Sequence, residues 1–254
     1  MADRGRAFED RFVVYFDFLG TRDAIRNWSS ARLDQFVELL QFLVRSRGRQ
    51  EISGMPQNDG SYKITVKAEI SAFSDHVVVS YSDFRYDEKE GGDVFRPHWA
   101  SIVCQDGIRI VSQIAELALR QGLLLRGAIS LGELFHDEDV VFGEALVHAH
   151  HLESTEAKYP RIVVSKRILS LFPDGPAAHS DLFIQDQADG IWHLNYFRQM
   201  PKHGGGVGSP ANVQRWNEAT MKIVADNISA MSDQSVPLEK WRWFEKQMAR
   251  AWGV

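Results

Sequence analysis

The stretch FVVYFDFLGT, residues 12–21, decides the fold of this chain. Residues 12–19 are all aromatic, β-branched or leucine except for one carboxylate, Asp17. That composition predicts a buried central strand. An unpaired carboxylate is costly in such a strand, so we expect Asp17 to bind a partner or to have a function. Gly20 and Thr21 then open a region with helical spacing, and the free N–H groups at the start of a helix suit phosphates.

A second carboxylate lies in a predicted hairpin. Two strand-like runs, 62–73 and 77–81, are separated only by Ser74, Asp75 and His76, which is hairpin spacing. Carboxylates from neighbouring strands can hold Mg²⁺ or Mn²⁺ against substrate phosphates. From the residues alone a plainer interpretation stays open, because an aspartate often caps a helix and is common in tight turns.

Local patterns predict the remaining elements, with loops at 46–61 and 83–97. Further strands are expected at 123–134, 140–143, 161–165, 181–185 and 191–197. Helices are expected within 25–44 and at 99–121, 144–157, 166–172, 211–231 and 238–252. Gly122 is expected to end the helix at 99–121. This order predicts an α+β domain over residues 10–200, a mostly antiparallel sheet with helices on one face, followed by a helical C-terminal extension over 201–254.

Composition narrows the function classes. The chain has 254 residues, a formal net charge of −5 and 44% hydrophobic residues, which is ordinary for a globular protein. The acidic balance argues against broad binding to nucleic acid, and the single cysteine, Cys104, excludes an intrachain disulfide. No apolar run approaches the roughly 20 residues of a membrane span, and the charged N-terminus lacks a signal-peptide core. These features predict a cytoplasmic protein without membrane or nucleic-acid partners.

Four segments in series resemble the class III adenylate and guanylate cyclases. Residues 12–21 resemble the first metal-binding strand of that family, and EISAFSDHVVVS (69–80) resembles its hairpin. LRGAISLGEL (125–134) is similar to the family's Arg-x-Gly-Ile-x-x-Gly strand. VVFGEALVHAHHLES (140–154) matches the segment in which aromatic-Gly-Asp opens a helix ending near Met-Glu-Ser. The resemblance covers roughly residues 12–165, in the family's order.

The resemblance implies a ferredoxin-like cyclase domain with a two-metal site. Asp17, Asp75 and the backbone carbonyl of Phe18 would bind two Mn²⁺ or Mg²⁺ ions per active site. Backbone N–H groups would bind the triphosphate at Phe18, Leu19, Gly20 and Thr21. The family reaction is attack of the 3′-oxygen on the α-phosphorus with release of pyrophosphate, in composite sites of a head-to-tail homodimer. Of the two aromatic residues that alternate faces just before Asp17, Tyr15 is a candidate for stacking on the base.

Several positions depart from the family pattern. Ser74 stands where the hairpin has glycine, and the residues that would read adenine, a lysine and an aspartate, are replaced by Ser71 and Val140. The family's Asn-x-x-x-Arg pair aligns with Val147 and His151. His151 could donate one hydrogen bond to phosphate as a weaker substitute for arginine. Other basic residues that could take the catalytic role are Arg126, Lys158 and Arg161.

A divergent cyclase without purine-reading residues, and with a C-terminal extension, resembles the bacterial Pycsar antiphage cyclases. That likeness implies UTP or CTP as substrate, UTP being favoured, and a separate effector that senses the cyclic product. Three alternatives stay open: an adenylate or guanylate cyclase with atypical base recognition, a catalytically silent nucleotide-binding domain, and a polymerase-like palm. A transition-metal site at Glu144 and His148 is a further alternative to a solvated helix face.

Overall fold

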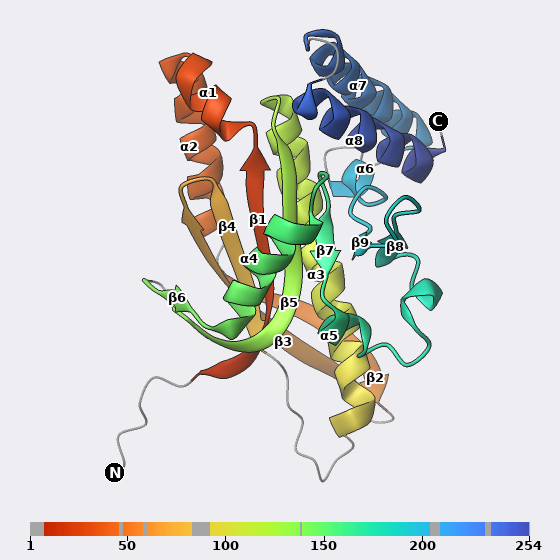
Figure 1. The fold of residues 1–254 in the computed structure, drawn as a ribbon. Coiled ribbons are helices and arrows are strands. Elements are labelled where there is room, and N and C mark those ends of the chain that lie inside the picture. Colours follow the sequence, from red (N-terminus) through yellow and green to blue (C-terminus); the bar gives the residue numbers. More distant parts are fainter. Residues whose placement is uncertain are drawn as a thin grey trace.

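The structure is a computed structural model that describes residues 8–45, 48–57, 60–82, 92–137, 139–203, 209–231 and 235–253. In these ranges nine strands form one sheet, with the order β2-β3-β4-β1-β5-β7-β9-β8 and β6 paired to β5 (Figure 1). The strands are β1 (Glu9–Leu19), β2 (Gly48–Gln57), β3 (Gly60–Phe73), β4 (His76–Ser82), β5 (Leu124–His136), β6 (Val141–Phe142), β7 (Ile162–Val164), β8 (Phe183–Gln185) and β9 (Trp192–Leu194). Every pair is antiparallel except β5 with β7.

The centre of the sheet has the predicted ferredoxin-like connectivity. After β1 come α1 (Thr21–Asn27) and α2 (Ser30–Arg45), then the β3–β4 hairpin, α3 (Gly92–Arg120) and β5. The four strands lie side by side as β3-β4-β1-β5, which is the spatial order of a β-α-β-β-α-β unit. The α+β class, the mostly antiparallel sheet and the hairpin are therefore confirmed.

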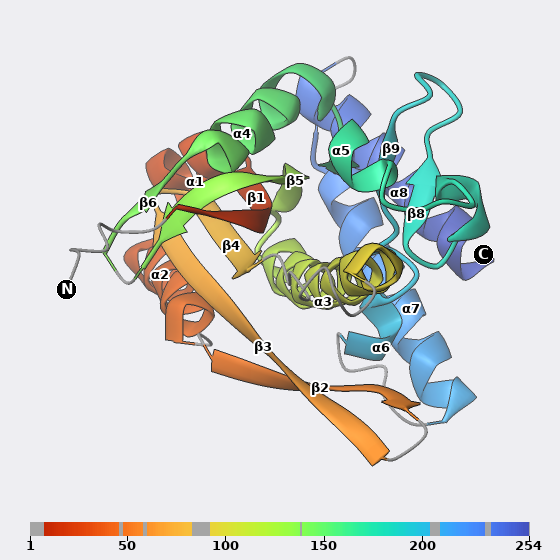
Figure 2. The same cartoon turned by 90° about the horizontal axis from the view of Figure 1, so that it is seen from below.

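Helices cover both faces of this sheet, whereas one covered face was expected. Phe12, Val14 and Phe16 of β1 belong to the main core with residues of α2 and α3, and the alternate residues Val13 and Tyr15 pack against α4 (Glu144–Glu156) (Figure 2). A strand that is apolar on both sides needs cover on both sides. The unbroken apolar run of β1 is the sequence counterpart of this second layer.

Strand β2 corrects the expected loop over 46–61. Residues Gly48–Gln57 pair with β3 at the edge of the sheet, with a register shift between Ser53 and Pro56. An edge strand needs no alternating apolar pattern to pair through its backbone, and proline is tolerated at edges and bulges. Likewise α3 begins at Gly92, inside the predicted excursion 83–97, and carries Pro97 within it.

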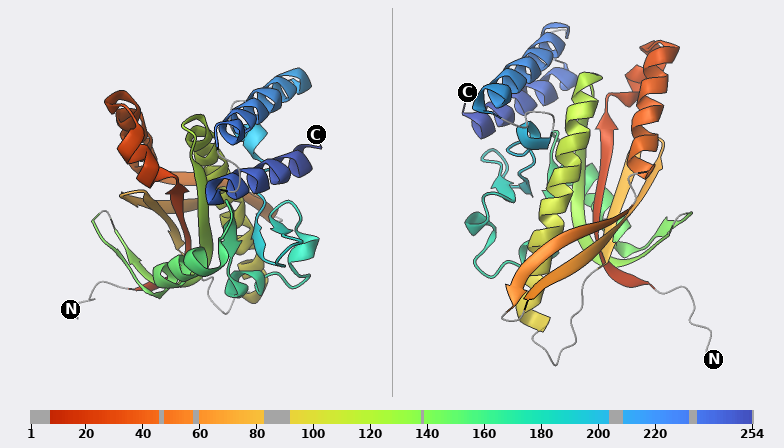
Figure 3. Two further views of the ribbon diagram at one scale, coloured as in Figure 1. Left: turned by 45° about the horizontal axis from the view of Figure 1, so that its top comes forward. Right: turned by 180° about the vertical axis from the view of Figure 1, so that it is seen from behind.

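The C-terminal helices share the main core. The helices α7 (Pro210–Ser229) and α8 (Val236–Trp252) pack together beside α3 (Figure 3). Trp216 of α7 and both Trp241 and Phe244 of α8 are buried in the same cluster as residues of α3. The remaining short helices are α5 (Lys166–Leu169), a 3₁₀ turn at Pro176–Ala178 and α6 (Met200–His203). Within the described ranges, none of the helices combines the length and apolarity that crossing a membrane requires.

Candidate functional site

Asp17 lies near the end of the central strand, between its two neighbours. Its backbone is in register with His76 of β4 on one side and Arg126 of β5 on the other. Strand β5 approaches closely here because residue 127 is glycine: a Cβ at Gly127 would lie 2.1 Å from the carbonyl oxygen of Tyr15. The fold therefore places Asp17 and Arg126 directly opposite each other.

The Arg126 guanidinium joins two carboxylates. Its Nε lies 3.0 Å from Asp17 Oδ1, its Nη2 lies 3.1 Å from Asp17 Oδ2, and its Nε lies 2.7 Å from Oε1 of the buried Glu153. Burial alone would lower the pKa of Arg126, but the hydrogen bonds and charge of Asp17 raise it above its usual value. The Nε–H thus donates to Asp17, whereas Glu153 is held as an ion pair and its Oε1 accepts no hydrogen bond from the described residues.

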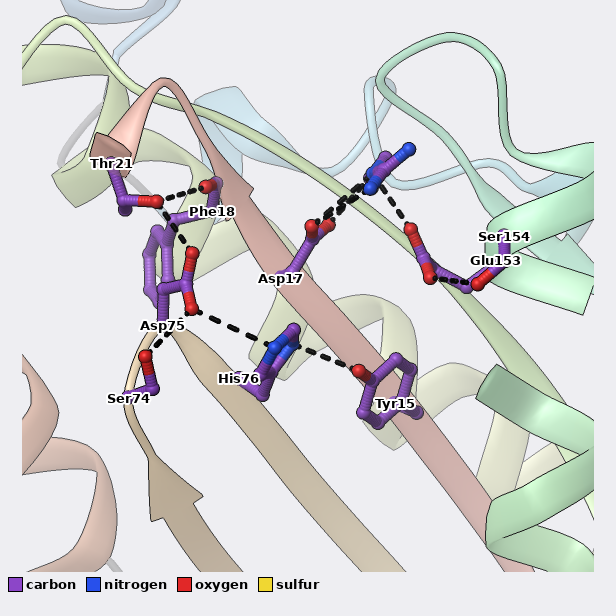
Figure 4. Close-up of polar contacts among 10 residues, drawn as sticks. Tyr15, Asp17, Phe18, Thr21, Ser74, Asp75, His76, Glu153 and Ser154 are labelled. Carbon is purple, nitrogen blue, oxygen red and sulfur yellow. Dashed lines mark hydrogen bonds and ion pairs between the residues drawn. The ribbon is translucent and has the colours of Figure 1, made fainter. Parts of the chain in front are cut away.

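Asp75 lies at the tip of the β3–β4 turn, as predicted. Its side chain accepts hydrogen bonds from the hydroxyls of Ser74 and Thr21, and its carbonyl accepts the N–H of Phe18 at 3.1 Å (Figure 4). Burial opposes ionisation of Asp75, but the hydrogen bonds from Thr21 and Ser74 outweigh it and hold the pKa below its usual value. Ser74 has a φ of 57°, a left-handed conformation that glycine adopts more easily than serine.

The hydroxyl of Thr21 marks where two expected oxygen ligands converge. Thr21 Oγ1 contacts Asp75 Oδ2 and lies 3.2 Å from the carbonyl oxygen of Phe18. Gly20, just before it, has a φ of 101° and turns the chain from β1 into α1. The turn thus brings the carbonyl of Phe18 beside Asp75, at the same end of β1 as Asp17 (Figure 4).

A tyrosine and a histidine link the two halves of the site. Tyr15 Oη lies 2.8 Å from His76 Nδ1, the two rings stack at 5.6 Å, and His76 Nε2 lies 3.6 Å from Asp75 Oδ1. Burial, followed by the negative charges of Glu153, Asp17 and Asp75, raises the pKa of Tyr15 well above its usual value. Tyr15 is only 2% exposed, so its ring packs on His76 and is not open to a base, in contrast to the stacking role expected for it.

The oxygen donors fit a hard divalent cation. Two carboxylates and the carbonyl of Phe18 are the ligands that Mg²⁺ and Mn²⁺ prefer. In the described part of the chain, no three histidine, cysteine, aspartate or glutamate side chains form a metal-binding group. Glu144 and His148 therefore have no third such ligand beside them. An ion at Asp17 and Asp75 would therefore complete its shell with carbonyl, water and substrate oxygens, as Mg²⁺ commonly does.

The two predicted base-reading positions lie on either side of a histidine that the sequence did not single out. Ser71 Oγ lies 2.9 Å from His136 Nε2, and Ser80 Oγ lies 2.8 Å from His136 Nδ1. His136 is paired with Val141, whose neighbour Val140 is 42% exposed. Ser71 therefore bonds His136 directly, and Val140 is the residue before the backbone partner of His136.

Other predicted residues lie elsewhere. Arg161 is fully buried and bound to Asp186 and Asp189, so its charge is already used and it is not free to replace a catalytic arginine. His151 is exposed within α4, and Lys158 is exposed just beyond its last residue, Glu156. Among the basic residues considered for catalysis, Arg126 is the one that the structure places beside Asp17.

A cavity of about 590 Å³ opens beside the β1–α1 turn. Its walls include Leu19 and Gly20 of that turn, Trp28 and Arg32 from the start of the helical region, and Lys240 of α8. The α3–β5 turn and α7 close the other sides. The cavity therefore joins the predicted phosphate-binding turn to the C-terminal helices.

Sequence reasoning did not identify three of the site's neighbours. Glu153 carried one local signal, because it follows Leu152 on the buried side of α4, where a carboxylate is out of place. His136 ends an apolar strand, and Lys240 belongs to an amphipathic helix more than a hundred residues away in sequence. Their placement depends on tertiary packing.

No protein-family model matches the chain, and no curated protein sequence matches it. Among solved structures, it is similar to the guanylyl cyclase Cya2, with 15% identity, a TM-score of 0.39, and coverage of 82% of this chain and 98% of that one. The adenylyl cyclase CyaB from P. aeruginosa matches with 15% identity, a TM-score of 0.41 and coverage of 74% and 94%. An adenylate/guanylate cyclase/hydrolase from Silicibacter pomeroyi matches with 17% identity, a TM-score of 0.38 and coverage of 74% and 97%. These identities and TM-scores are too low to assign a role to any residue of this chain. The roles of its residues are therefore argued from its own side chains.

Proposed function

We propose that this chain is a nucleotide cyclase that converts UTP, or CTP, to the 3′,5′-cyclic monophosphate and pyrophosphate. One observation carries the proposal: Asp17 and Asp75, with the carbonyl of Phe18, lie at one end of two adjacent strands, beside a turn that opens a helix. Oxygen donors next to free backbone N–H groups suit a metal-bound triphosphate.

Asp17, Asp75 and Phe18 would hold two Mn²⁺ or Mg²⁺ ions, which when bound polarise phosphoryl oxygens and lower the pKa of the ribose 3′-hydroxyl. The chain's own groups do the positioning. Thr21 holds the Asp75 carboxylate by a hydrogen bond, and the low pKa of Asp75 keeps that carboxylate ionised at neutral pH. Leu19, Gly20 and Thr21 would present N–H groups to the phosphates. The N–H of Phe18, which was expected to join them, instead donates to the carbonyl of Asp75.

The preference for a pyrimidine rests on what surrounds the base-reading positions. Ser71 and His136 offer a hydroxyl and an imidazole, and Val140 offers only methyl groups, so no lysine–aspartate pair stands there to bond the edge of adenine. A site that leaves the donors of a base unpaired rejects that base. A hydroxyl and a valine in place of the longer lysine and aspartate would suit the smaller ring of uracil or cytosine.

A second copy of the chain would complete the site. Phe142 of β6 is 64% exposed, Val147 of α4 is 66% exposed, and Phe8, whose ring centroid lies 6.1 Å from that of Phe142, is 49% exposed. Apolar side chains gathered on a projecting arm are typical of an interaction surface. In a head-to-tail homodimer this face would bring His151 toward the partner's substrate, while Arg126 would act on the substrate bound by its own chain.

The product would act as a second messenger for a separate effector in antiphage defence, following the resemblance to the Pycsar cyclases. The alternative of a silent nucleotide-binding domain has one observation in its favour. Both oxygens of Asp17 already face Arg126, and Val147 cannot supply the hydrogen bonds of the family asparagine. Turnover separates the two functions.

The test is to incubate the purified chain with each of the four NTPs and Mn²⁺ and to identify products by mass spectrometry. We expect cyclic UMP or cyclic CMP, lost in Asp17→Ala and Asp75→Ala but kept in Asp174→Ala, which removes an exposed carboxylate outside the site. Cyclic AMP or GMP would instead indicate atypical purine recognition, and binding without a product would indicate the silent domain.

A mixing experiment tests the shared site. Asp17→Ala and His151→Ala would each be inactive or weak alone. If residues 17 and 151 act on one substrate from two different chains, a mixture contains heterodimers with one intact site. We expect partial recovery of turnover on mixing, and additive residual rates would contradict a composite site.

A further inference from the structure

Lys240 is a half-buried cation without a partner of its own. It lies on α8, beside the buried Trp241, and makes no hydrogen bond or ion pair with any residue that the structure describes. Lysine is rarely buried unless it is paired. By contrast, Lys222 on α7 is exposed and paired with Asp226 at 2.9 Å. The unpaired lysine is the one that faces the cavity.

The cavity places Lys240 opposite the phosphate-binding turn. Leu19 and Gly20 form one wall, and Val236, Lys240 and Trp241 form another. A volume of about 590 Å³ is within the usual range for a small-molecule site. The β1–α1 turn therefore lies on one side of the cavity and the ammonium group of Lys240 on the other.

The charges around Lys240 belong to the candidate site. Burial, and then the positive charge of Arg126, lower the pKa of Lys240, while Asp17 and Glu153 raise it. Both carboxylates already contact Arg126, so neither neutralises Lys240 directly. Two neighbouring cations, one of them unpaired, attract an anion that carries more than one negative charge.

We infer that α8 supplies Lys240 as a substrate-binding residue that holds the terminal phosphates of a nucleoside triphosphate in this cavity. The inference rests on the proposed function and deepens it. The β- and γ-phosphates carry most of the charge of the substrate, and an ammonium can neutralise it without the fixed geometry of a guanidinium. The C-terminal helices, which otherwise complete the core, thereby form part of the site.

The test measures binding of a triphosphate that cannot be cyclised. The probe is the UTP analogue with a methylene group in place of the oxygen between the α- and β-phosphates, with UMP as comparison, both titrated by calorimetry in Mn²⁺. Losing one charged hydrogen bond should weaken binding of the analogue roughly 10- to 100-fold in Lys240→Gln. UMP binding should not change, and Lys240→Arg should recover most of the affinity.

Lys246→Gln is the matched control, because Lys246 is exposed on the same helix. Equal binding of the analogue by the wild type and Lys240→Gln would overturn the inference while leaving the proposed function intact. Equal losses for UMP and the analogue would indicate a structural role and would overturn it too. If the wild type binds neither probe and cyclises no NTP, the proposed function itself fails and the inference fails with it.

Discussion

Two arginines, each between two carboxylates, show how differently one chain uses the same chemical groups. Arg161 is fully buried, and its two Nη atoms bond Asp189 as a fork and also reach Asp186. Trp243 and the N–H of Ala188 bond the remaining acceptors of Asp186. Around Arg161, every carboxylate oxygen has a partner.

The cluster around Arg126 is open by comparison. The Arg126 side chain is 28% exposed, its Nε donates to Asp17 and forms an ion pair with Glu153, and its Nη1 has no hydrogen bond within the described residues. Arg161 also keeps one nitrogen, Nε, without a hydrogen bond within the described residues, but it is sealed in the core, whereas the unbonded nitrogen of Arg126 belongs to a partly exposed side chain that a ligand could reach. The four predictions below would break or sharpen this distinction, and they run from the largest expected effect to the smallest.

Arg161→Met should cause the largest loss of stability. It leaves Asp186 and Asp189 without their cation, and breaking a buried pair typically costs about 3–5 kcal/mol. The free energy of unfolding from urea denaturation measures the loss. Arg167→Met, at a half-exposed arginine with a long 3.5 Å contact to Asp10, is the control and should cost less than about 1 kcal/mol. Equal losses would mean that the Arg161 cluster is not structural.

Lowering the pH should destabilise the folded chain, because the buried His193 next to the Arg161 cluster resists protonation. Burial lowers the pKa of His193 to about 4 from 6.5. In the unfolded chain His193 binds a proton near pH 6.5, whereas in the folded chain it does so only near pH 4. The free energy of unfolding therefore falls by about 3 kcal/mol as the pH falls through that window. Below it, Asp189, whose pKa is lowered because the hydrogen bond from Arg161 outweighs burial, adds to the loss.

The measurement is the free energy of unfolding at half-unit steps between pH 4 and 7. His193→Gln should flatten the slope in this window, whatever its effect on absolute stability. His148→Gln, which changes an exposed histidine of α4, should leave the slope as in the wild type. A slope that survives His193→Gln would assign it to other groups.

Arg126→Lys should lower turnover with little effect on folding. Lysine keeps the positive charge between Asp17 and Glu153 but cannot make the two-pronged contact with Asp17. Loss of one oriented donor at a reacting charge typically costs roughly 100-fold in turnover. Cyclisation of UTP in Mn²⁺ and the melting temperature are the two readouts. Unchanged turnover would move Arg126 out of the catalytic machinery.

Ser74→Gly should have the smallest effect on stability. Glycine removes the cost of a left-handed serine, about 1 kcal/mol, but loses a similar amount through chain entropy. Losing the hydroxyl also removes a hydrogen bond that keeps the pKa of Asp75 low, so that pKa rises and the acid limb of activity moves to higher pH. Ser74→Ala should move the limb equally while losing stability. An unmoved limb in both variants would show that Asp75 does not limit activity.

Most of the helices and strands could be predicted from apolar patterns in the sequence. β1, the hairpin and β5 follow from apolar runs, α2 and α8 follow from helical periodicity, and Asp17 and Asp75 were recognisable as carboxylates within or between apolar runs. β2 was not, because an edge strand pairs through its backbone and leaves no alternating pattern. Lys240 was not either, because nothing within α8 indicates which distant groups its lysine will face. A local pattern identifies an element, whereas a site depends on how elements pack.

The position of β1 at the centre of the sheet also bears on how the chain folds. Its partner in β5 is remote: Asp17 and Arg126 are 109 residues apart in sequence. Contacts that close such long loops form slowly, because the chain loses entropy before the pairing stabilises it. During synthesis β1 can pair on one side once β4 has emerged, since Tyr15 and His76 are 61 residues apart, but its other edge must wait for β5 and stays open to misassociation for longer.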